Sequence, residues 1–210
     1  MSTDKSISWS YSEGLPAEDE VLLRARERSY ELGVSAVSAG VGAALTVIAA
    51  ATKAKTAVEI GSGAGVSGVC LLRGLDTNAV LTTIDVDVEH LRAARLAYQE
   101  AGSAANRTRT ISGRAADVLP RLTDAAYDLV FIDADKPGLP GYVEQAIRLL
   151  KRGGTLIIND ALDKDRVSNP AARDAGTVIL RQVGKTIRED ERLFSAMLPT
   201  GDGLLVAVKK

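Results

Sequence analysis

The chain has little of several residue types on which common classes of protein depend. Its 210 residues include one cysteine, Cys70, and one histidine, His90. A single cysteine excludes an internal disulfide framework, and a single histidine excludes metal motifs built on histidine pairs. Aromatic residues make up only 4% of the sequence, so the core has to be built from alanine, valine, leucine and isoleucine.

The chain also lacks an excess of charge of either sign. Lysine and arginine number 26 against 27 aspartates and glutamates, which leaves a formal net charge of −1. The overall charge therefore does not attract nucleic acid or an anionic membrane to the whole surface. A local basic patch is still compatible with this composition. The hydrophobic share of 46% excludes general disorder. The length is typical of one domain, which we expect to span residues 1–210.

A long, strongly apolar run is missing too. The uncharged stretch at 34–51 contains one leucine and one isoleucine, and Gly40 and Gly42 interrupt it. A transmembrane helix needs about 20 strongly apolar residues, so we interpret this stretch as a buried, alanine-rich helix. The first ten residues are polar and show no signal-peptide pattern. We therefore expect no membrane partner and a cytoplasmic protein.

From residue 56 onward the sequence alternates strands and helices. The predicted buried strands are Thr56–Gly61, Ala79–Asp85, Thr108–Gly113, Tyr127–Asp133 and Thr155–Asp160. The predicted helices after them are Val66–Arg73, Val88–Ala101, Arg114–Leu122, Tyr142–Leu150 and Pro170–Val183. Strands that are apolar on both faces and alternate with helices are typical of a parallel sheet covered on two sides. The pair Gly153–Gly154 is expected to turn the chain into the fifth strand.

The two ends of the chain complete the predicted fold. Strands at Leu193–Leu198 and Leu204–Val208, joined through Pro199–Gly203, form an expected hairpin that adds one antiparallel strand. The fold class is therefore α/β, a Rossmann-like, doubly wound, mostly parallel sheet of seven strands with one antiparallel C-terminal strand and helices on both faces. We expect a loose arm over the first dozen residues, followed by helices at Pro16–Leu32 and Gly42–Thr52. Residues 1–52 then form an N-terminal helical arm and cap, and residues 53–210 form the core.

Each predicted parallel strand ends in polar residues or glycine. In strand order these are Glu59 with Gly61–Gly65, Asp85 with Asp87, Gly113–Ala115, Asp133 with Asp135 and Lys136, and Asn159–Asp160. Ligands of open α/β sheets bind beyond the carboxyl ends of the strands. The sequence therefore predicts a functional site along this edge.

The glycine-rich loop after the first strand points to a nucleoside-containing cofactor. Its glycines, Gly61, Gly63 and Gly65, permit close approach of a ligand, and the following helix presents free N–H groups. Asp85, at the end of the next strand, is placed to accept hydrogen bonds from ribose hydroxyls. A dinucleotide pattern would need glycine where Val66 stands, so acid-x-Gly-x-Gly-x-Gly fits better.

That pattern resembles the first motif of S-adenosylmethionine-dependent methyltransferases. The segments that narrow the resemblance are VEIGSGAGVSG, TTIDVDVEHLRAAR, ISGRAADVLPRL, YDLVFIDADK and LLKRGGTLIIND. In this order and spacing they resemble the cation-dependent O-methyltransferase family, which includes the catechol and caffeoyl-CoA enzymes and small bacterial relatives. The resemblance covers the chain from about residue 41 to the C terminus.

The resemblance implies S-adenosylmethionine as cofactor and a role for each matching residue. The implied cofactor-binding residues are Val41, Glu59, Gly61, Ser62, Gly63, Gly65, Ser67, Asp85, Val86, Ala115 and Asp133. Within this set, Asp85 is implied to bind the ribose, and Val86 and Ala115 to lie beside the adenine. Asp133 is implied to be catalytic, where a carboxylate meets the metal and the reacting hydroxyl, and Lys136 to be the general base.

A divalent cation such as Mg²⁺ is also implied, with Asp133, Asn159 and Asp160 as its ligands. The family follows its fifth strand with Asp-Asn, whereas this chain has Asn159–Asp160. Successive strand residues point to opposite faces, so the reversal puts an amide where the inner carboxylate belongs. Metal dependence and metal independence therefore both stay open. Asp165 also replaces the family's usual glycine before Arg166.

The function implied by the resemblance is methyl transfer to a hydroxyl oxygen of a small, phenol- or catechol-like acceptor, in a homodimer. An NAD(P)-dependent oxidoreductase is a first alternative, since it shares the glycine loop and the ribose acid. A catalytically silent cofactor-binding protein is a second, motivated by the reversed Asn159–Asp160 pair. A nucleic-acid acceptor has no support from the near-neutral charge.

Four residues also have plainer interpretations. Lys136 fits a solvated surface charge as well as it fits a base, because its ordinary pKa lies far above neutrality. His90 is expected on a solvent-facing helix surface, and Cys70 in the core. Trp9 either covers the acceptor pocket or pins the N-terminal arm.

Overall fold

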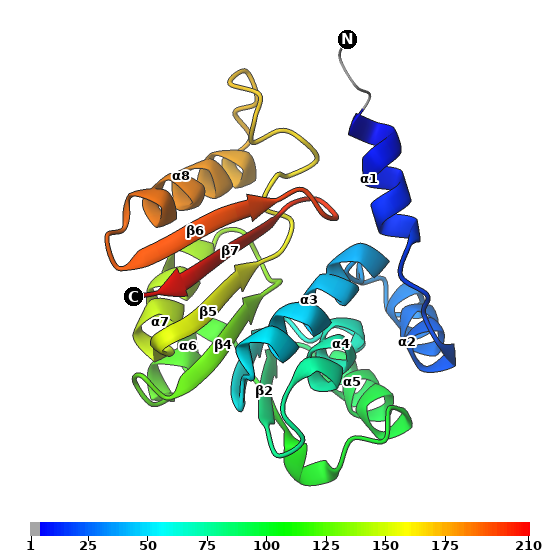
Figure 1. Cartoon of the computed structure of the whole chain (residues 1–210). Coiled ribbons are helices and arrows are strands. Elements are labelled where there is room, and N and C mark those ends of the chain that lie inside the picture. The colour runs from blue at the N-terminus through cyan, green and yellow to red at the C-terminus, as the bar shows by residue number, and fades with distance from the viewer. Residues whose placement is uncertain (1–4) are drawn as a thin grey trace.

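The computed structural model describes residues 5–210, and one mixed sheet organises them (Figure 1). The strands are β1 Thr56–Ile60, β2 Val80–Asp85, β3 Thr108–Ser112, β4 Tyr127–Ile132, β5 Leu150–Ile158, β6 Leu193–Leu198 and β7 Leu204–Lys209. Their order is β3-β2-β1-β4-β5-β7-β6, with β1 to β5 parallel and β7 antiparallel to both of its neighbours. The predicted fold class is confirmed.

Helices cover both faces of the sheet. The α-helices are α1 Lys5–Gly14, α2 Glu20–Glu31, α3 Ala39–Thr52, α4 Val66–Gly74, α5 Val88–Glu100, α6 Ala115–Val118, α7 Leu139–Leu149 and α8 Ala175–Glu189. Short 3₁₀ helices lie at Ala105–Arg107 and Leu119–Arg121. Figure 1 shows α6, α7 and α8 on one side of the sheet and α3, α4 and α5 on the other. Within residues 5–210, no helix is long and apolar enough to cross a bilayer.

Alternation along the central strands builds two separate hydrophobic cores. Val58 and Ile60 of β1 pack into the core beneath α7 and α8, whereas Ala57 packs into the core beneath α3, α4 and α5. Neighbouring side chains of a strand point to opposite faces, so Glu59 falls on the same face as Ala57. A carboxyl group therefore lies inside a largely apolar layer, directly below the glycine loop.

The N-terminal segment differs from the prediction. Residues 5–14 form helix α1, so the expected loose arm is wrong there, while residues 1–4 lie outside the described part. Trp9 and Glu13 connect α1 to the rest of the protein. Trp9 Nε1 donates a hydrogen bond to the Gly201 carbonyl at 3.2 Å, and Glu13 accepts from the backbone N–H groups of Gly40 and Gly201 at 3.2 and 2.7 Å. These contacts join residues far apart in the sequence, so no local pattern predicts them.

Two boundaries on the other half of the sheet also differ. The pair Gly153–Gly154 does not turn the chain into β5 but lies inside it, at a register irregularity opposite Tyr127–Leu129. Helix α8 begins at Ala175 and not at Pro170. A loop over 159–174 therefore follows β5, and loops of that length in compact proteins are commonly functional.

Candidate active site

Two cavities meet at the carboxyl edge of the sheet. The smaller, of about 630 Å³, is lined by the glycine loop, Asp85 and residues 113–116. The larger, of about 1130 Å³, lies between α1, the loop after β5 and the β6–β7 turn. Asp133 lines both cavities, together with residues 35–37. The structure thus brings residues from all five predicted strand ends to the two cavities, although Glu59 and Lys136 line neither of them.

The glycine loop is shaped by close packing as well as by its cavity. Gly61, Gly63 and Gly65 all have positive φ, at 91°, 47° and 92°. A Cβ on Gly61 would stand 1.9 Å from the Asp133 carbonyl oxygen, and one on Gly65 would stand 2.8 Å from Cα of Ala94. Gly63, by contrast, has room for a Cβ, which would only touch Val34 Cγ2 at 3.9 Å, and it lines the smaller cavity. Two glycines therefore serve packing, and the third leaves bare backbone facing the cavity.

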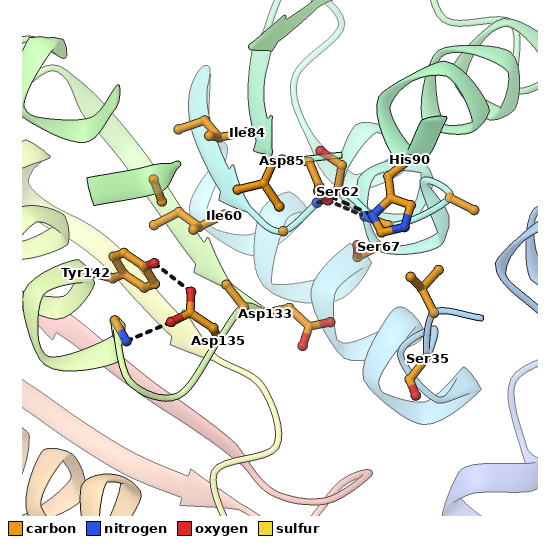
Figure 2. A pocket seen from close by; sticks show the side chains of 18 of the residues that line it. Ser35, Ile60, Ser62, Ser67, Ile84, Asp85, His90, Asp133, Asp135 and Tyr142 are labelled. Carbon is orange, nitrogen blue, oxygen red and sulfur yellow. Dashed lines mark hydrogen bonds and ion pairs between the residues drawn. The ribbon is translucent and has the colours of Figure 1, made fainter. Parts of the chain in front are cut away.

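Asp85 joins the loop to the cavity wall. Its Oδ2 accepts hydrogen bonds from the backbone N–H groups of Ser62 and Gly63 at 2.9 and 3.1 Å, and its Oδ1 accepts from the N–H of Asp87 at 3.0 Å. His90 Nδ1 lies 3.3 Å from the same Oδ1. Figure 2 shows this group on one side of the smaller cavity, with Asp133 between it and Tyr142.

His90 was not among the predicted site residues, and the expectation that it faces solvent is wrong. Its side chain is 18% exposed and lines the smaller cavity. Helix α5 begins directly after Asp87, which caps it through the N–H of Glu89, so the first helical turn directs His90 toward Asp85. The spacing from the acid at 85 was the only available signal, and by itself it does not reveal the direction of the helix.

Glu59 supports the glycine loop from below and does not line either cavity. It is fully buried, and it accepts hydrogen bonds from the hydroxyls of Ser67 at 2.7 Å, Thr83 at 2.6 Å and Tyr98 at 3.4 Å. Burial raises the pKa of Glu59 to about 7, because desolvation disfavours the charged form and these hydrogen bonds offset it only in part. Ser67 also lines the smaller cavity, so it links this buried network to the surface of the site.

The carboxylate of Asp133 stands at the end of β4, within a group of oxygen atoms. Asn159 Nδ2 donates a hydrogen bond to Asp133 Oδ1 at 3.2 Å, while the buried Oδ1 of Asn159 has no hydrogen-bond partner among the described residues. Burial raises the pKa of Asp133 to about 6, and the charge of Asp160 adds to the effect. A half-buried carboxylate therefore lies beside an amide group whose oxygen is buried without a hydrogen-bond partner.

Asp160 reaches the same cavity as Asn159, contrary to the alternation expected of a strand. Strand β5 ends at Ile158, and Asp160 has a φ of 52°, so the chain has already left extended geometry. The reversed pair therefore does not put one side chain on the far face of the sheet. Both residues line the larger cavity.

The remaining predicted residues fall in three places. Val86 and Ala115 line the smaller cavity as expected, whereas Val41 lines the larger one. Lys136 is missing from the described residues that line either cavity, and its Nζ forms an ion pair with Asp163. Cys70 is buried in the core, and Trp9 both lines the larger cavity and holds α1.

Comparison with known proteins agrees with this geometry. The sequence model of the O-methyltransferase family matches residues 12–210. The chain belongs to the O-methyltransferase family. A Mycobacterium tuberculosis protein that carries the name O-methyltransferase is 49% identical over 201 residues, which covers 96% of this chain and 90% of that protein. The resemblance noted in the sequence is confirmed.

Solved structures of similar proteins share the whole fold. A Corynebacterium glutamicum protein superposes with a TM-score of 0.89 at 35% identity, covering 98% of this chain and 96% of the other. TomG, an O-methyltransferase from Streptomyces achromogenes crystallised with S-adenosylmethionine, gives 0.87 at 28% identity over the full length of both chains. An O-methyltransferase from Bacillus cereus in complex with S-adenosylhomocysteine gives 0.86 at 25% identity, covering 98% and 97%. The expected class, an S-adenosylmethionine-dependent O-methyltransferase, is confirmed at the level of the family.

Proposed function

We propose that this enzyme methylates a hydroxyl oxygen of a small, phenol- or catechol-like acceptor, with S-adenosylmethionine held in the smaller cavity and the acceptor in the larger. One observation carries the proposal: Asp133 lies where the two cavities meet. Two reactants bound on either side of that point would have their reacting atoms next to each other. Such positioning contributes a large part of the rate of a two-substrate transfer.

The smaller cavity fits an adenosyl group through the residues already described. Gly63 leaves bare backbone facing the cavity, and Asp85 presents a carboxylate of the kind that binds ribose hydroxyls. The residues assigned to the cofactor are Gly61, Ser62, Gly63, Ser67, Asp85, Val86, His90, Ala115 and Asp133, all of which line the cavity. Glu59 and Gly65 are assigned an indirect role, because they shape the loop from beneath, and Val41 is assigned to the acceptor side.

The chemistry then divides between the bound donor and the protein. S-adenosylmethionine, when bound, supplies a methyl group on a sulfonium that a hydroxyl oxygen displaces. The glycine loop and Asp85 orient the donor, and Trp9 and the loop after β5 bound the space for the acceptor. Asp133 presents its carboxylate to the acceptor hydroxyl, and helix α1 lines one side of the larger cavity.

Asp133, Asn159 and Asp160 also fit a divalent cation as a donor set. All three line the larger cavity and offer oxygen atoms, which Mg²⁺ prefers, and the unpartnered Oδ1 of Asn159 supplies a buried acceptor. Bound there, a cation would supply positive charge beside the acceptor oxygen. Restoring the family order with Asn159→Asp plus Asp160→Asn is expected to tighten Mg²⁺ binding, measured by calorimetry. Unchanged affinity would argue against the site.

The function is tested by binding and by turnover. We expect S-adenosylhomocysteine to bind the purified protein in calorimetry, with methylation of a simple catechol when Mg²⁺ is present. Absence of any binding would reject the proposal, while NADH binding in its place would favour the oxidoreductase alternative. Turnover would exclude the catalytically silent alternative. Repeating the assay with a metal chelator tests whether turnover requires a divalent cation.

Three broader expectations stay predictions. The chain folds as a single domain, residues 1–52 capping a core at 53–210, and the one sheet with both faces covered supports this. The homodimer follows from family resemblance, and the cytoplasmic location from the lack of a signal-peptide pattern and of a long apolar run in the sequence. Size-exclusion chromatography with light scattering measures the oligomeric state.

A further inference from the structure

We propose that His90 and Asp85 together bind one hydroxyl of the cofactor ribose, which donates a hydrogen bond to Asp85 and accepts one from His90. The inference rests on the proposed function only where it places an adenosyl group in the smaller cavity. It gives a defined role to a histidine that neither the glycine loop nor the pattern of strand ends predicts.

The carboxylate of Asp85 has all of its acceptor positions filled in this structure. Its two oxygen atoms together offer about four lone-pair positions. The backbone N–H groups of Ser62 and Gly63 fill two of them, at 2.9 and 3.1 Å from Oδ2. The N–H of Asp87 and Nδ1 of His90 fill the other two, at 3.0 and 3.3 Å from Oδ1. A ribose hydroxyl can therefore donate to Asp85 only where one of these four donors gives way.

His90 is the donor that can give way at the lowest cost. The other three donors are backbone groups, which hold the glycine loop and the turn before α5, whereas His90 donates through a side chain and makes the longest contact. Its second ring nitrogen, Nε2, lies 3.9 Å from Asp87 Oδ2, which is too far for a hydrogen bond. Because the side chain lines the smaller cavity, the ring can turn into open space (Figure 2).

A hydroxyl placed between Asp85 and His90 satisfies both of these side chains. A ribose hydroxyl is a donor and an acceptor, whereas a carboxylate only accepts, so Nδ1 carries the proton in the present pair. The nearby N–H groups of Ser62 and Gly63 are already used by Asp85. The N–H of His90 is then in place to donate to the hydroxyl oxygen. One hydrogen bond is replaced by two, and neither side chain loses its partner.

A purely structural role for His90 predicts a different behaviour. If the ring only orients Asp85, its removal weakens the binding of every adenosyl ligand by the same factor. If the ring contacts a hydroxyl, the effect of its removal depends on whether the ligand carries that hydroxyl. Ligands that differ in one ribose hydroxyl therefore distinguish the two roles.

The first test is isothermal titration calorimetry on the full-length protein, with S-adenosylhomocysteine and its 2′-deoxy and 3′-deoxy forms as ligands. His90→Ala should weaken binding of S-adenosylhomocysteine by about 3- to 10-fold, the range expected for one uncharged hydrogen bond. For one of the two deoxy forms this difference between the wild type and His90→Ala should disappear, because the hydroxyl that His90 contacts is missing.

Two further variants show whether the lost hydrogen bond is the cause. Asparagine carries an N–H group one bond from Cγ, as Nδ1 of histidine does, so His90→Asn should bind S-adenosylhomocysteine more tightly than His90→Ala. Glu89→Gln changes an exposed neighbour in the same helical turn, which lines neither cavity. It is the matched control and should bind all three ligands as the wild type does.

The second test follows the wild-type protein by NMR and needs no variant. His90 is the only histidine of the sequence, so protein labelled with ¹⁵N at histidine and freed of any affinity tag gives ring signals from this residue alone. Saturation with S-adenosylhomocysteine should shift the resonance of Nδ1, because its acceptor changes from a carboxylate to a hydroxyl. The deoxy form that lacks the contacted hydroxyl should produce a smaller shift.

Either of two results would overturn the inference. The first is an Nδ1 resonance that stays in place when S-adenosylhomocysteine saturates the protein. The second is a His90→Ala protein that binds S-adenosylhomocysteine as the wild type does, or that loses the same factor for all three ligands. A wild type that binds no S-adenosylhomocysteine would reject the proposed function and this inference with it, whereas binding accompanied by either result rejects this inference alone.

Discussion

At the scale of single residues, the acids of the strand edge have different tasks despite their similar positions. Asp85 organises the glycine loop and faces the smaller cavity, Asp133 faces both cavities, and Glu59 is buried beneath the loop. Their surroundings differ accordingly. Burial raises the pKa of Glu59 and of Asp133. Burial would also raise the pKa of Asp163, but hydrogen bonds from Arg166, Lys136 and Thr177 outweigh it and lower that pKa.

Asp85→Ala is expected to weaken binding of S-adenosylhomocysteine by about 10- to 100-fold, because hydrogen bonds to a charged group contribute about 1.5–3 kcal/mol. The loss includes the two N–H bonds that hold the loop in shape. Isothermal titration calorimetry measures this affinity. The control is Asp124→Ala, which changes an exposed acid that does not line the cavity. An affinity equal to that of the wild type would remove the basis of the cofactor assignment.

Glu59→Gln is expected to flatten the dependence of stability on pH. The pKa of Glu59 is about 7 in the folded protein and near 4.5 when unfolded, so the folded state holds the extra proton between these values. The free energy of unfolding should therefore fall as the pH rises from about 4.5 to about 7. Urea titrations across this range should show a shallower fall for Glu59→Gln. An equally steep fall of the free energy of unfolding in Glu59→Gln would contradict this prediction. Glu191→Gln, on an exposed turn, serves as the control.

At the scale of elements, α1 lies at the margin of the fold and packs mainly against α3. None of its described residues is buried, and Figure 1 shows it standing apart from the layers that cover the sheet. Glu13 and Trp9 fasten it to the β6–β7 turn and to the start of α3. Its position beside the larger cavity therefore depends on a few polar contacts and not on a packed core.

Glu13→Ala is expected to free α1, because it removes the acceptor for the N–H groups of Gly40 and Gly201 and for the hydroxyl of Thr200. Amide exchange over residues 5–14 should become several-fold faster, as for a locally unfolding unit. Glu31→Ala, on an exposed position of α2, should leave that exchange as it is. Unchanged exchange in Glu13→Ala would mean that other contacts hold α1.

At the scale of the whole molecule, the two cavities are built from different parts of the chain. The glycine loop and the strand ends near it form the smaller one, whereas α1, the loop after β5 and the β6–β7 turn form most of the larger. Asp133 and residues 35–37 are what they share. The two halves of the site are therefore expected to respond separately to mutation.

Trp9→Ala is expected to affect only one of these halves. It alters the wall of the larger cavity and the attachment of α1, so turnover of an acceptor should fall. Stabilisation by S-adenosylhomocysteine should persist, at about 2.7 kcal/mol for a ligand concentration of 100 times Kd. Thermal unfolding with and without the ligand measures this. Loss of the ligand-induced shift in Trp9→Ala would show that the two cavities are coupled.

Local pattern alone determined much of this protein. Alternation of apolar strands with helices predicted the doubly wound sheet, because a strand buried on both faces needs helices on both sides. The glycine loop and Asp85 were found because turn chemistry and strand ends are readable over a few residues. The family followed from the same segments.

Tertiary structure decided what depends on contacts between distant parts of the chain. The helical state of α1 depends on Gly40 and Gly201, the direction of His90 depends on Asp85, and the partner of Lys136 lies 27 residues away. The common orientation of Asn159 and Asp160 depends on where β5 stops and the backbone turns. Periodicity reports which face of an element is buried, but only the packed fold determines which side chains then meet across the site.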